Sequence, residues 1–261
     1  MNSIIRQRLF QQIVSLAKIS GRNYYIPRRA LLYVPGDDPK KISKSFTLDA
    51  DCIALDCEDG VAINRKENAR ETIRSFLDKG KPTLSRDYDL GVRINSLETP
   101  YWQEDLKACL TAKFLPDTIL VPKIETDETV RLVGITRTED ANEVLYARQK
   151  LVLVAKAFHL QAIDMVYIKY KDLEGLKMQC QQGMRMGYTG KQVIHPGQVS
   201  VVQDAFLPSP SQIEWALGLL KSFEEHQKQG KGAFTYKGNM IDMPTMKQAE
   251  NTAKLARLKT S

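Results

Sequence analysis

The sequence predicts an α/β protein built on a parallel sheet or barrel, and two observations lead to this fold class. Apolar, strand-like runs alternate with helical stretches over residues 30–194, which is typical of parallel sheets. Several runs also end in polar clusters. Because strand C-termini converge on one face of a barrel, where active sites lie, these clusters indicate an enzyme. The four runs are ALLYVPG (30–36), CIALDCEDG (52–60), GVRINS (91–96) and YTGKQVIHP (188–196).

Six strands are expected to alternate with five helices. The strands are expected at 30–34, 52–56, 91–95, 118–122, 162–168 and 191–194. The helices are expected near 39–48, 65–79, 102–113, 139–158 and 172–185. Thr136 and Glu139 form a capping box for the fourth helix. A closed barrel of this type has eight strands, so the count is two short, and the break falls around residues 126–138.

The C-terminal part has a different pattern. Pro208-Ser-Pro210 marks a boundary, and an amphipathic helix follows. A Gly-punctuated extended segment (229–244) then leads to a last helix near 245–257. We interpret residues 208–261 as an arm appended to the barrel of residues 25–207. Its apolar side chains pack either on its own barrel or on a neighbouring subunit.

Charge excludes some functions. The chain of 261 residues has a net charge of +7, but residues 1–29 hold six basic and no acidic residues. The remaining 32 basic and 31 acidic residues give residues 30–261 a charge of about +1. This balance gives no electrostatic reason to bind nucleic acid. No apolar run approaches the roughly 18 residues of a membrane span.

The first 24 residues are typical of a mitochondrial transit peptide. They are rich in Arg, free of acids, and carry apolar residues at helical spacing. Cleavage is expected before Tyr25, and the alternative is a basic surface helix. A reducing matrix also fits the cysteines, which show neither metal-ligand spacing nor a disulfide framework. They are Cys52, Cys57, Cys109 and Cys180.

Asp56, Glu58 and Asp59 form a dense carboxylate cluster at one strand end. Such a cluster suits Mg²⁺, bound directly or through ordered water, and could equally orient an arginine. Capping of a helix by Asp59 is the structural alternative. Arg93, on the next apolar strand, needs a carboxylate partner or an anionic ligand if it is buried.

Three other positions are candidates with open alternatives. Lys40, Lys41 and Lys44 at a helix start suit a phosphate-bearing handle such as coenzyme A, or form a solvated helix face. His195 at a strand end could bind substrate or cap the strand. Asp242 stands among apolar residues, which favours a raised pKa and acid/base work, although by this pattern alone an N-cap is preferred.

Seven motifs together resemble the citrate lyase beta-like family of the HpcH/HpaI aldolase/citrate lyase superfamily, over nearly everything after residue 25. They are RRALLYVPGDDPKK, LDCEDGVA, VRINS, VPKIE, LYARQK, GYTGKQVIHP and GAFTYKGNMIDMP. The resemblance implies a Mg²⁺-dependent (β/α)₈ barrel that makes or breaks a carbon–carbon bond beside a CoA thioester. The implied reaction is retro-Claisen cleavage of (3S)-citramalyl-CoA to acetyl-CoA and pyruvate, with malate- or methylmalate-synthase side activity. A trimer of the mitochondrial matrix is the implied setting.

The resemblance also assigns roles to residues of this sequence. Tyr33, Lys40 and Lys44 would bind the CoA portion. Arg93 would bind substrate and stabilise negative charge as the bond breaks. The backbone of Ile194 with His195 would hold the thioester end. In addition, Asp242 would be the general acid/base, supplied across a subunit interface, which reverses the preference for a cap.

The sequence departs from the family pattern. The family's metal ligands, a Glu on strand five and an Asp on strand six, have no counterpart, because VPKIETDETV passes directly to RLVGITRTEDANEVLYARQ. On the order of 70 residues are missing near 130–132, judged against the usual barrel size. Mg²⁺ would then depend on Glu58 and Asp59. By the family pattern, these two residues and Asp56 surround the metal site without contacting the ion. Lys169 also stands where relatives carry an acid. An impaired splice form, or a CoA-binding subunit that assembles with full-length protomers, is therefore the alternative.

Overall fold

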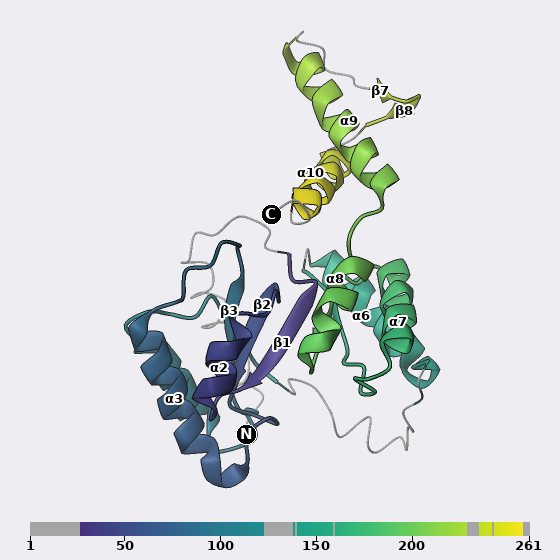
Figure 1. Cartoon of the computed structure of the whole chain (residues 1–261). Helices are drawn as coiled ribbons and strands as arrows, with labels where there is room; N and C mark the ends of the chain where they lie inside the picture. Colours follow the sequence, from purple (N-terminus) through teal and green to yellow (C-terminus); the bar gives the residue numbers. More distant parts are fainter. Residues whose placement is uncertain are drawn as a thin grey trace.

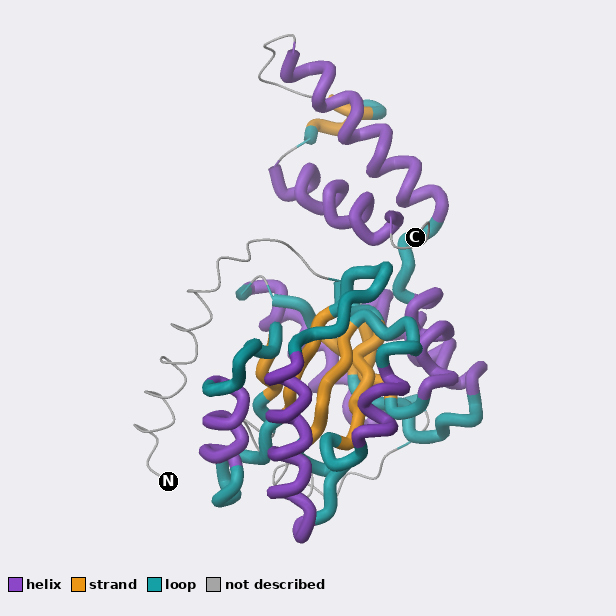
Figure 2. The backbone as a smooth tube through the Cα atoms, turned by 60° about the vertical axis from the view of Figure 1, so that its left-hand side comes forward, coloured by secondary structure: helices purple, strands orange, loops and turns teal. Residues whose placement is uncertain are grey.

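A single parallel sheet forms the centre of the molecule. The computed structural model describes residues 27–122, 138, 140–158, 160–228, 235–241 and 243–257. Six parallel strands form a curled half-barrel in the order β4-β3-β2-β1-β6-β5, with helices packed around it (Figures 1 and 2). The strands are β1 (Ala30–Pro35), β2 (Cys52–Asp56), β3 (Asp89–Arg93), β4 (Thr118–Leu120), β5 (Ile163–Asp164) and β6 (Gly190–Val193).

All six expected strands are confirmed, with shifts at their ends. The strand expected at 162–168 is the least accurate, because only Ile163 and Asp164 pair with β6. β5 is an edge strand of the sheet, and natural proteins often keep such strands very short. Helices follow as α2 (Pro39–Ser45), α3 (Lys66–Lys79), α4 (Trp102–Leu110), α6 (Leu145–Ala157), α7 (Leu173–Met186) and α8 (Val199–Ala205). The short 3₁₀ turns are η1 (Ile63–Arg65), η2 (Asn142–Val144) and η3 (Pro196–Gln198).

The helix expected at 139–158 begins later, at Leu145 after the η2 turn. The expected capping box lies outside the described residues, since both Thr136 and Glu139 belong to undescribed positions. The next helix is confirmed: Asp172 caps α7 by accepting from the Gly175 N–H at 2.9 Å. Gly187 ends α7 with a left-handed φ of 102°, a conformation that glycine adopts without strain.

The strand order shows where the barrel is interrupted. β6, the last strand, pairs in parallel with β1, the first, with Leu31 opposite Gln192. All other strands that pair in the sheet are consecutive in the sequence. β4 and β5 are also consecutive in the sequence, but they form the two opposite edges of the sheet. A closed barrel has eight strands. The opening therefore falls between β4 and β5, as the strand count predicts.

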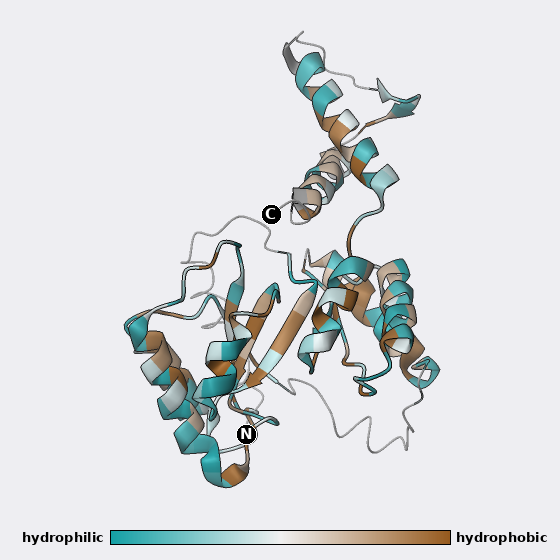
Figure 3. Cartoon of the chain, in the orientation of Figure 1, coloured by the Kyte–Doolittle hydropathy of each residue, from teal (hydrophilic) through white to brown (hydrophobic). Residues whose placement is uncertain are grey.

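The two faces of the sheet carry different cores. The outer face packs against the helices through a large apolar cluster that includes Leu32, Leu55, Ile73 and Leu176. The inner face holds a smaller cluster of Leu31, Cys52 and Ala54, with Tyr33, Leu120 and Ile163 packed against it. Figure 3 shows the strands largely brown, whereas the helices mix teal and brown.

All four cysteines are free thiols and are buried. Burial raises the pKa of the Cys180 thiol to about 11 and that of Cys109 to about 12. The thiolate is the reactive form of cysteine, so these side chains serve as small core residues at neutral pH.

A buried ionic cluster joins β5, β6, α6 and α7. Asp164 and Lys191 are fully buried. Arg148 donates to both Asp164 oxygens, at 3.1 and 2.8 Å, and Lys191 Nζ donates to Asp164 Oδ2 at 3.0 Å. Lys191 also donates to Gln179 Oε1 at 2.6 Å. Desolvation lowers the pKa of Lys191, against the attraction of Asp164. Hydrogen bonds of this kind are what make buried charges tolerable.

The C-terminal residues form an arm with its own core. α9 (Pro210–Lys228) and α10 (Met243–Arg257) pack together around Ala216, Leu219, Met246 and Ala249. Between them, β7 (Thr235–Tyr236) and β8 (Asn239–Met240) form a hairpin. Its two central residues, Lys237 and Gly238, have φ of 48° and 81°, as a type I′ turn requires.

The arm lies beyond the end of the sheet at which the strands begin (Figures 1 and 2). The arm is therefore remote from the carboxyl ends of β1–β6 in the same chain. Within the described part of the chain, no helix combines the length and the apolar character that a membrane span needs.

The buried cluster gives a stability prediction. Asp164→Asn leaves two buried cations facing each other, so we expect a loss of about 3–5 kcal/mol in the free energy of unfolding. Lys191→Met leaves Asp164 with its Arg148 contacts and should cost about 1–3 kcal/mol. Urea denaturation at pH 7 measures both. Equal losses in the two variants would contradict the central place given to Asp164.

Candidate functional site at the strand ends

Arg93 and Asp56 form the centre of the candidate site. Asp56 ends β2 and Arg93 ends β3, and the parallel register places them opposite each other. Arg93 Nε donates to Asp56 Oδ1 at 2.8 Å and Nη2 donates to Oδ2 at 2.7 Å. The pair is bidentate, the strongest geometry for an arginine and a carboxylate. The Arg93 side chain keeps 16% of its surface exposed, so it is the member that a ligand can reach.

The Asp56 carboxylate also shapes the loop that follows β2. Its oxygens accept from the Glu58 N–H at 2.7 Å and the Gly60 N–H at 2.8 Å. A Cβ on Gly60 would stand 2.6 Å from Asp56 Oδ2, too close for any other residue without a shift. Asp56 therefore accepts four hydrogen bonds and is saturated.

Glu58 supplies a second carboxylate to the same arginine. Its Oε2 lies 3.1 Å from Arg93 Nη1, with only 6% of the side chain exposed. Lys66 lies buried behind the loop, and its ammonium donates to the carbonyls of Cys57 and Glu58 at 2.8 and 2.7 Å. The acidic loop is thus held between two cations.

Tyr33 lies under Arg93. The guanidinium carbon is 4.2 Å from the centre of the Tyr33 ring, which is a cation–π contact. Burial raises the pKa of the Tyr33 phenol, against the opposing effect of the Arg93 charge. Burial disfavours the charge of Arg93, but the hydrogen bonds and charge of Asp56 outweigh this and raise its pKa. Arg93 is therefore a permanent cation at the carboxyl ends of β1–β6, the region that we call the mouth.

These contacts decide several alternatives. The structural reading of Arg93, an ion pair with the acidic cluster, is confirmed, and its exposure leaves room for an anionic ligand as well. The alternative for Asp59, a helix cap, is wrong: Ala62 precedes η1, and no side chain caps it or α3. Asp59 is exposed.

The acidic loop does not fit a Mg²⁺ ion as the residues stand. Both oxygens of Asp56 are saturated, and Glu58 faces the guanidinium of Arg93. Among the described residues, no group of three or more His, Cys, Asp or Glu side chains could hold a metal ion. The weak candidates Glu58 and Asp59 are therefore not a magnesium site by themselves.

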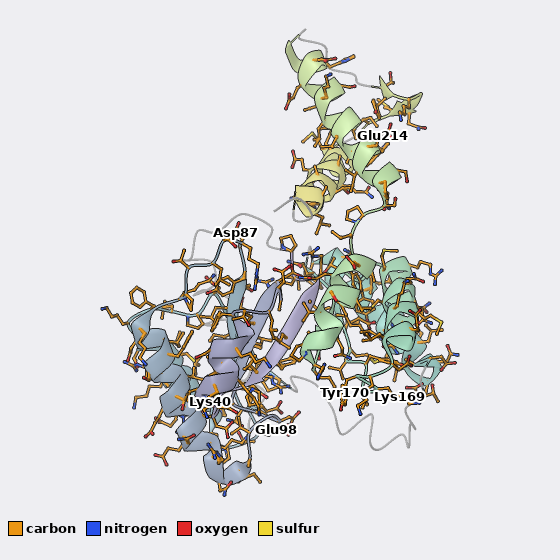
Figure 4. The ribbon with its side chains drawn as sticks, in the orientation of Figure 1. Lys40, Asp87, Glu98, Lys169, Tyr170 and Glu214 are labelled. Atoms are coloured by element: carbon orange, nitrogen blue, oxygen red, sulfur yellow. The ribbon has the colours of Figure 1, made fainter. Side chains whose placement is uncertain are left out.

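Lys40 and Lys44 lie on α2, which begins just after β1. Asp38 caps this helix, accepting from the backbone N–H of Lys40 at 3.0 Å and of Lys41 at 3.1 Å. Both Lys40 and Lys44 are exposed. Figure 4 shows Lys40 at the same end of the sheet as Glu98 and Tyr170, whereas Asp87 lies at the other end. Lys40 therefore lies at the carboxyl ends of the strands, and Lys44 lies in the last turn of the same helix.

Ile194 and His195 follow β6 at the same end. The Ile194 N–H donates to Gln198 Oε1 at 2.9 Å, so this amide is already used. His195 Nδ1 accepts from the Gly197 N–H at 3.1 Å, which makes His195 the cap of the η3 turn rather than of the strand. A neutral imidazole that accepts at Nδ1 carries its proton on Nε2. Exposed His195 therefore offers a donor.

Sequence reasoning missed three residues around His195. The ring of Tyr170 lies 4.8 Å from that of His195, centre to centre. Gln198 bridges to Tyr167, because its Nε2 donates to the Tyr167 carbonyl at 3.0 Å. One signal could have found Gln198: it stands three residues after a polar N-cap and before an apolar run, the spacing of a capping box. Nothing in the sequence pattern marks Tyr170.

Asp242, the expected acid/base, lies outside the described residues. Its described neighbours Ile241 and Met243 belong to the arm, which lies at the opposite end of the sheet from the mouth (Figures 1 and 4).

Sites at strand carboxyl ends, with an arginine and lysines around them, are typical of barrel enzymes that bind anionic substrates.

Comparison with known proteins identifies this barrel class more closely. The model of the HpcH/HpaI aldolase/citrate lyase family matches residues 29–133 and 130–196. The chain therefore belongs to the HpcH/HpaI aldolase/citrate lyase family, a family of lyase enzymes.

Individual relatives agree with the family. The mitochondrial citramalyl-CoA lyase of Homo sapiens is 40% identical over 306 residues, covering 91% of this chain and 88% of that protein. A (3S)-malyl-CoA thioesterase of Cereibacter sphaeroides is 31% identical, covering 83% and 90%. A solved structure of CitE from Mycobacterium tuberculosis, in complex with magnesium, acetoacetate and coenzyme A, superposes with a TM-score of 0.63 at 25% identity. It covers 88% of this chain and 98% of that one.

The alignment with the human lyase is longer than the part of this chain that it covers. It runs over 306 positions, whereas 91% of 261 residues is about 238, so about 68 positions have no residue in this chain. The family model also matches in two pieces that meet at residues 130–133.

The Arg93 cluster gives a second prediction. Arg93→Met removes the counter-charge of two buried carboxylates, so we expect a loss of about 3–5 kcal/mol in the free energy of unfolding at pH 7. Arg74→Met is the matched control, since Arg74 pairs with Asp78 at the surface and such pairs contribute less than about 1 kcal/mol. A loss in Arg93→Met no larger than the loss in the Arg74→Met control would contradict the role given to the Arg93 charge.

Proposed function

We propose that this chain is a carbon–carbon lyase of the citramalyl-CoA type, located in the mitochondrion. The observation that carries the proposal is the cation Arg93, fixed by Asp56 and Glu58 at the carboxyl ends of the strands, in a chain 40% identical to a citramalyl-CoA lyase. An exposed, permanently charged guanidinium suits the carboxylate of a short hydroxy acid.

The proposed roles divide the mouth into two parts. Lys40 and Lys44, on the exposed rim, would attract the phosphates of CoA. His195, whose Nδ1 is occupied by the Gly197 N–H, would donate from Nε2 to the thioester oxygen. Tyr33 would pack beside the acyl chain and hold the Arg93 guanidinium in its plane.

The reaction needs two proton movements. Cleavage breaks the bond between the carbinol carbon and the methylene beside the thioester, the hydroxyl loses its proton, and pyruvate leaves. The methylene carbon is left as an enolate and takes a proton to give acetyl-CoA. Arg93 would stabilise the negative charge during this step. Asp242 would exchange the proton, and because the arm lies away from its own mouth, a neighbouring subunit would supply it, in a trimer.

We infer that a segment missing near residues 130–132 interrupts the barrel and leaves it as an open half-barrel. Supporting it are the open edges at β4 and β5, the about 68 alignment positions that have no residue in this chain, and the family match in two pieces that meet at residues 130–133. The flank of α6 supports it as well: Tyr146, Leu153 and Phe158 are 75, 73 and 71% exposed. A barrel helix normally lies between two neighbours, and the segment that would cover α6 is the one that is missing.

A second function, CoA binding without turnover, is favoured by the metal chemistry. Mg²⁺ polarises the carbonyl oxygens of bound substrates where a protein holds it, and the CitE structure contains it. The described residues of this chain do not form such a site. In this reading the chain is an impaired form that binds CoA and assembles with full-length protomers, to which its arm donates Asp242.

The leader is part of the proposal. The citramalyl-CoA lyases of human, mouse and rat are named mitochondrial, and residues 1–24 have the acid-free, Arg-rich composition of a transit peptide. We propose import into the matrix with cleavage before Tyr25. Mass spectrometry of the protein from isolated mitochondria measures the mature N-terminus.

Turnover separates the two functions. For the lyase, purified residues 25–261 should release acetyl-CoA from citramalyl-CoA, and both EDTA and Asp242→Asn should abolish the release. For the binding form, the folded chain should bind acetyl-CoA, measured by calorimetry, without any release. A folded chain that does neither contradicts both functions.

The rim lysines give a further prediction. Lys40→Ala and Lys44→Ala should each weaken acetyl-CoA binding about two- to fivefold, the effect of one exposed charge pair, and the effect should fade as salt rises. Lys156→Ala is the control, since Lys156 is an exposed lysine in the last turn of α6, beside the other edge of the sheet. An equal loss in the control would show that the rim lysines have no special place.

A further inference from the structure

We propose that Gln198 is a positioning residue that fixes the backbone of Ile194 and His195, and thereby the donor that His195 presents to a CoA thioester. The inference rests on the proposed function and deepens it by naming the residue that holds this part of the site. Gln198 is 1% exposed and belongs to the short η3 turn that follows β6.

The side chain of Gln198 uses both ends. Its Oε1 accepts from the Ile194 N–H at 2.9 Å and the His195 N–H at 3.3 Å. Its Nε2 donates to the Tyr167 carbonyl at 3.0 Å. A buried amide whose bonds are made on both sides is geometrically determined. The two residues after β6 are therefore held in one conformation.

The same bonds extend to the exit of β5. Tyr167 donates its hydroxyl to Asp172 Oδ2 at 2.6 Å, and Asp172 caps α7. Because β5 and β6 pair through two residues only, Gln198 is a main link between the exits of these strands. A fixed Tyr167 also determines where the following loop places Tyr170, whose ring lies beside His195.

The contacts of Gln198 decide which group can donate a hydrogen bond to the thioester oxygen. With its N–H occupied by Gln198, Ile194 cannot donate to a thioester oxygen, so the task falls to the Nε2–H of His195. His195 keeps this tautomer because its backbone position, fixed by Gln198, brings Nδ1 within 3.1 Å of the Gly197 N–H. Loss of the Gln198 side chain frees both backbone amides and the ring together.

The experiment compares three variants of residues 25–261 in two measurements, acetyl-CoA affinity by calorimetry and amide exchange of peptides that contain residues 190–198. Gln198→Met should speed exchange of the Ile194 and His195 amides and weaken acetyl-CoA binding about fivefold or more, as expected for loss of about 1 kcal/mol of hydrogen bonding. Gln203→Met is the control, since Gln203 is also buried and donates to the Asp49 carbonyl, remote from His195. It should change neither measurement at this site.

Gln198→Glu tests the two ends separately. An ionised Glu keeps an acceptor for Ile194 and His195 but loses the donor to Tyr167. Protonation restores that donor. Exchange in this variant, relative to the unsubstituted chain at the same pH, should therefore approach unity at pH 5 and exceed it at pH 7.5. A ratio that does not change with pH would contradict the bond to Tyr167.

The outcomes distinguish this inference from the proposed function. Faster exchange with unchanged affinity in Gln198→Met overturns the role in binding, and unchanged exchange overturns the inference altogether. If the unsubstituted chain binds no acetyl-CoA, the proposed function fails. In that case Gln198 keeps its positioning role only if exchange rises in Gln198→Met and not in Gln203→Met.

Discussion

The parallel register of β2 with β3 is the constraint on which the site depends. It sets Asp56 opposite Arg93 at the last rung of the ladder, and the bidentate pair then orders everything near it. Asp56 accepts from the loop amides, Arg93 holds Glu58 and covers Tyr33, and Gly60 is required by the closeness of the carboxylate. A shift of one residue would turn both charged side chains to the outer face, against the apolar core under the helices.

The second constraint is the pairing of the last strand with the first. It keeps the exits of β1 and β6 side by side, so α2 with its lysines and the His195 turn share one end of the sheet. The opening lies on the far side, between β4 and β5. On that side α6 exposes apolar residues, and the sheet has two open strand edges, which favour association when they are unprotected.

The sequence predicts what depends on local pattern. All six strands, the short count and the ion pair of Arg93 follow from apolar runs with charges at their ends. The two-residue β5 does not, because ladder length depends on a neighbouring strand that the segment cannot specify. Gln198 and Tyr170 were missed for a similar reason. The Tyr167 carbonyl, to which Gln198 donates, belongs to a different segment of the chain, and a turn sets the position of the His195 ring beside Tyr170. The capping-box spacing was the one local sign of Gln198.

Charge balance at the mouth bears on which function this form performs. The acidic loop holds three carboxylates, Asp56, Glu58 and Asp59, against the two cations Arg93 and Lys66, a net charge of −1. The acyl part of citramalyl-CoA brings a further carboxylate, and two like charges 4 Å apart repel by about 4 kcal/mol at an effective dielectric constant of 20. A divalent cation at the site would reverse that sign, but the described residues do not form a place for one. Lys40 and Lys44 of α2 are exposed and can attract phosphate. The lyase function therefore depends on positive charge from outside the described residues, whereas CoA binding does not.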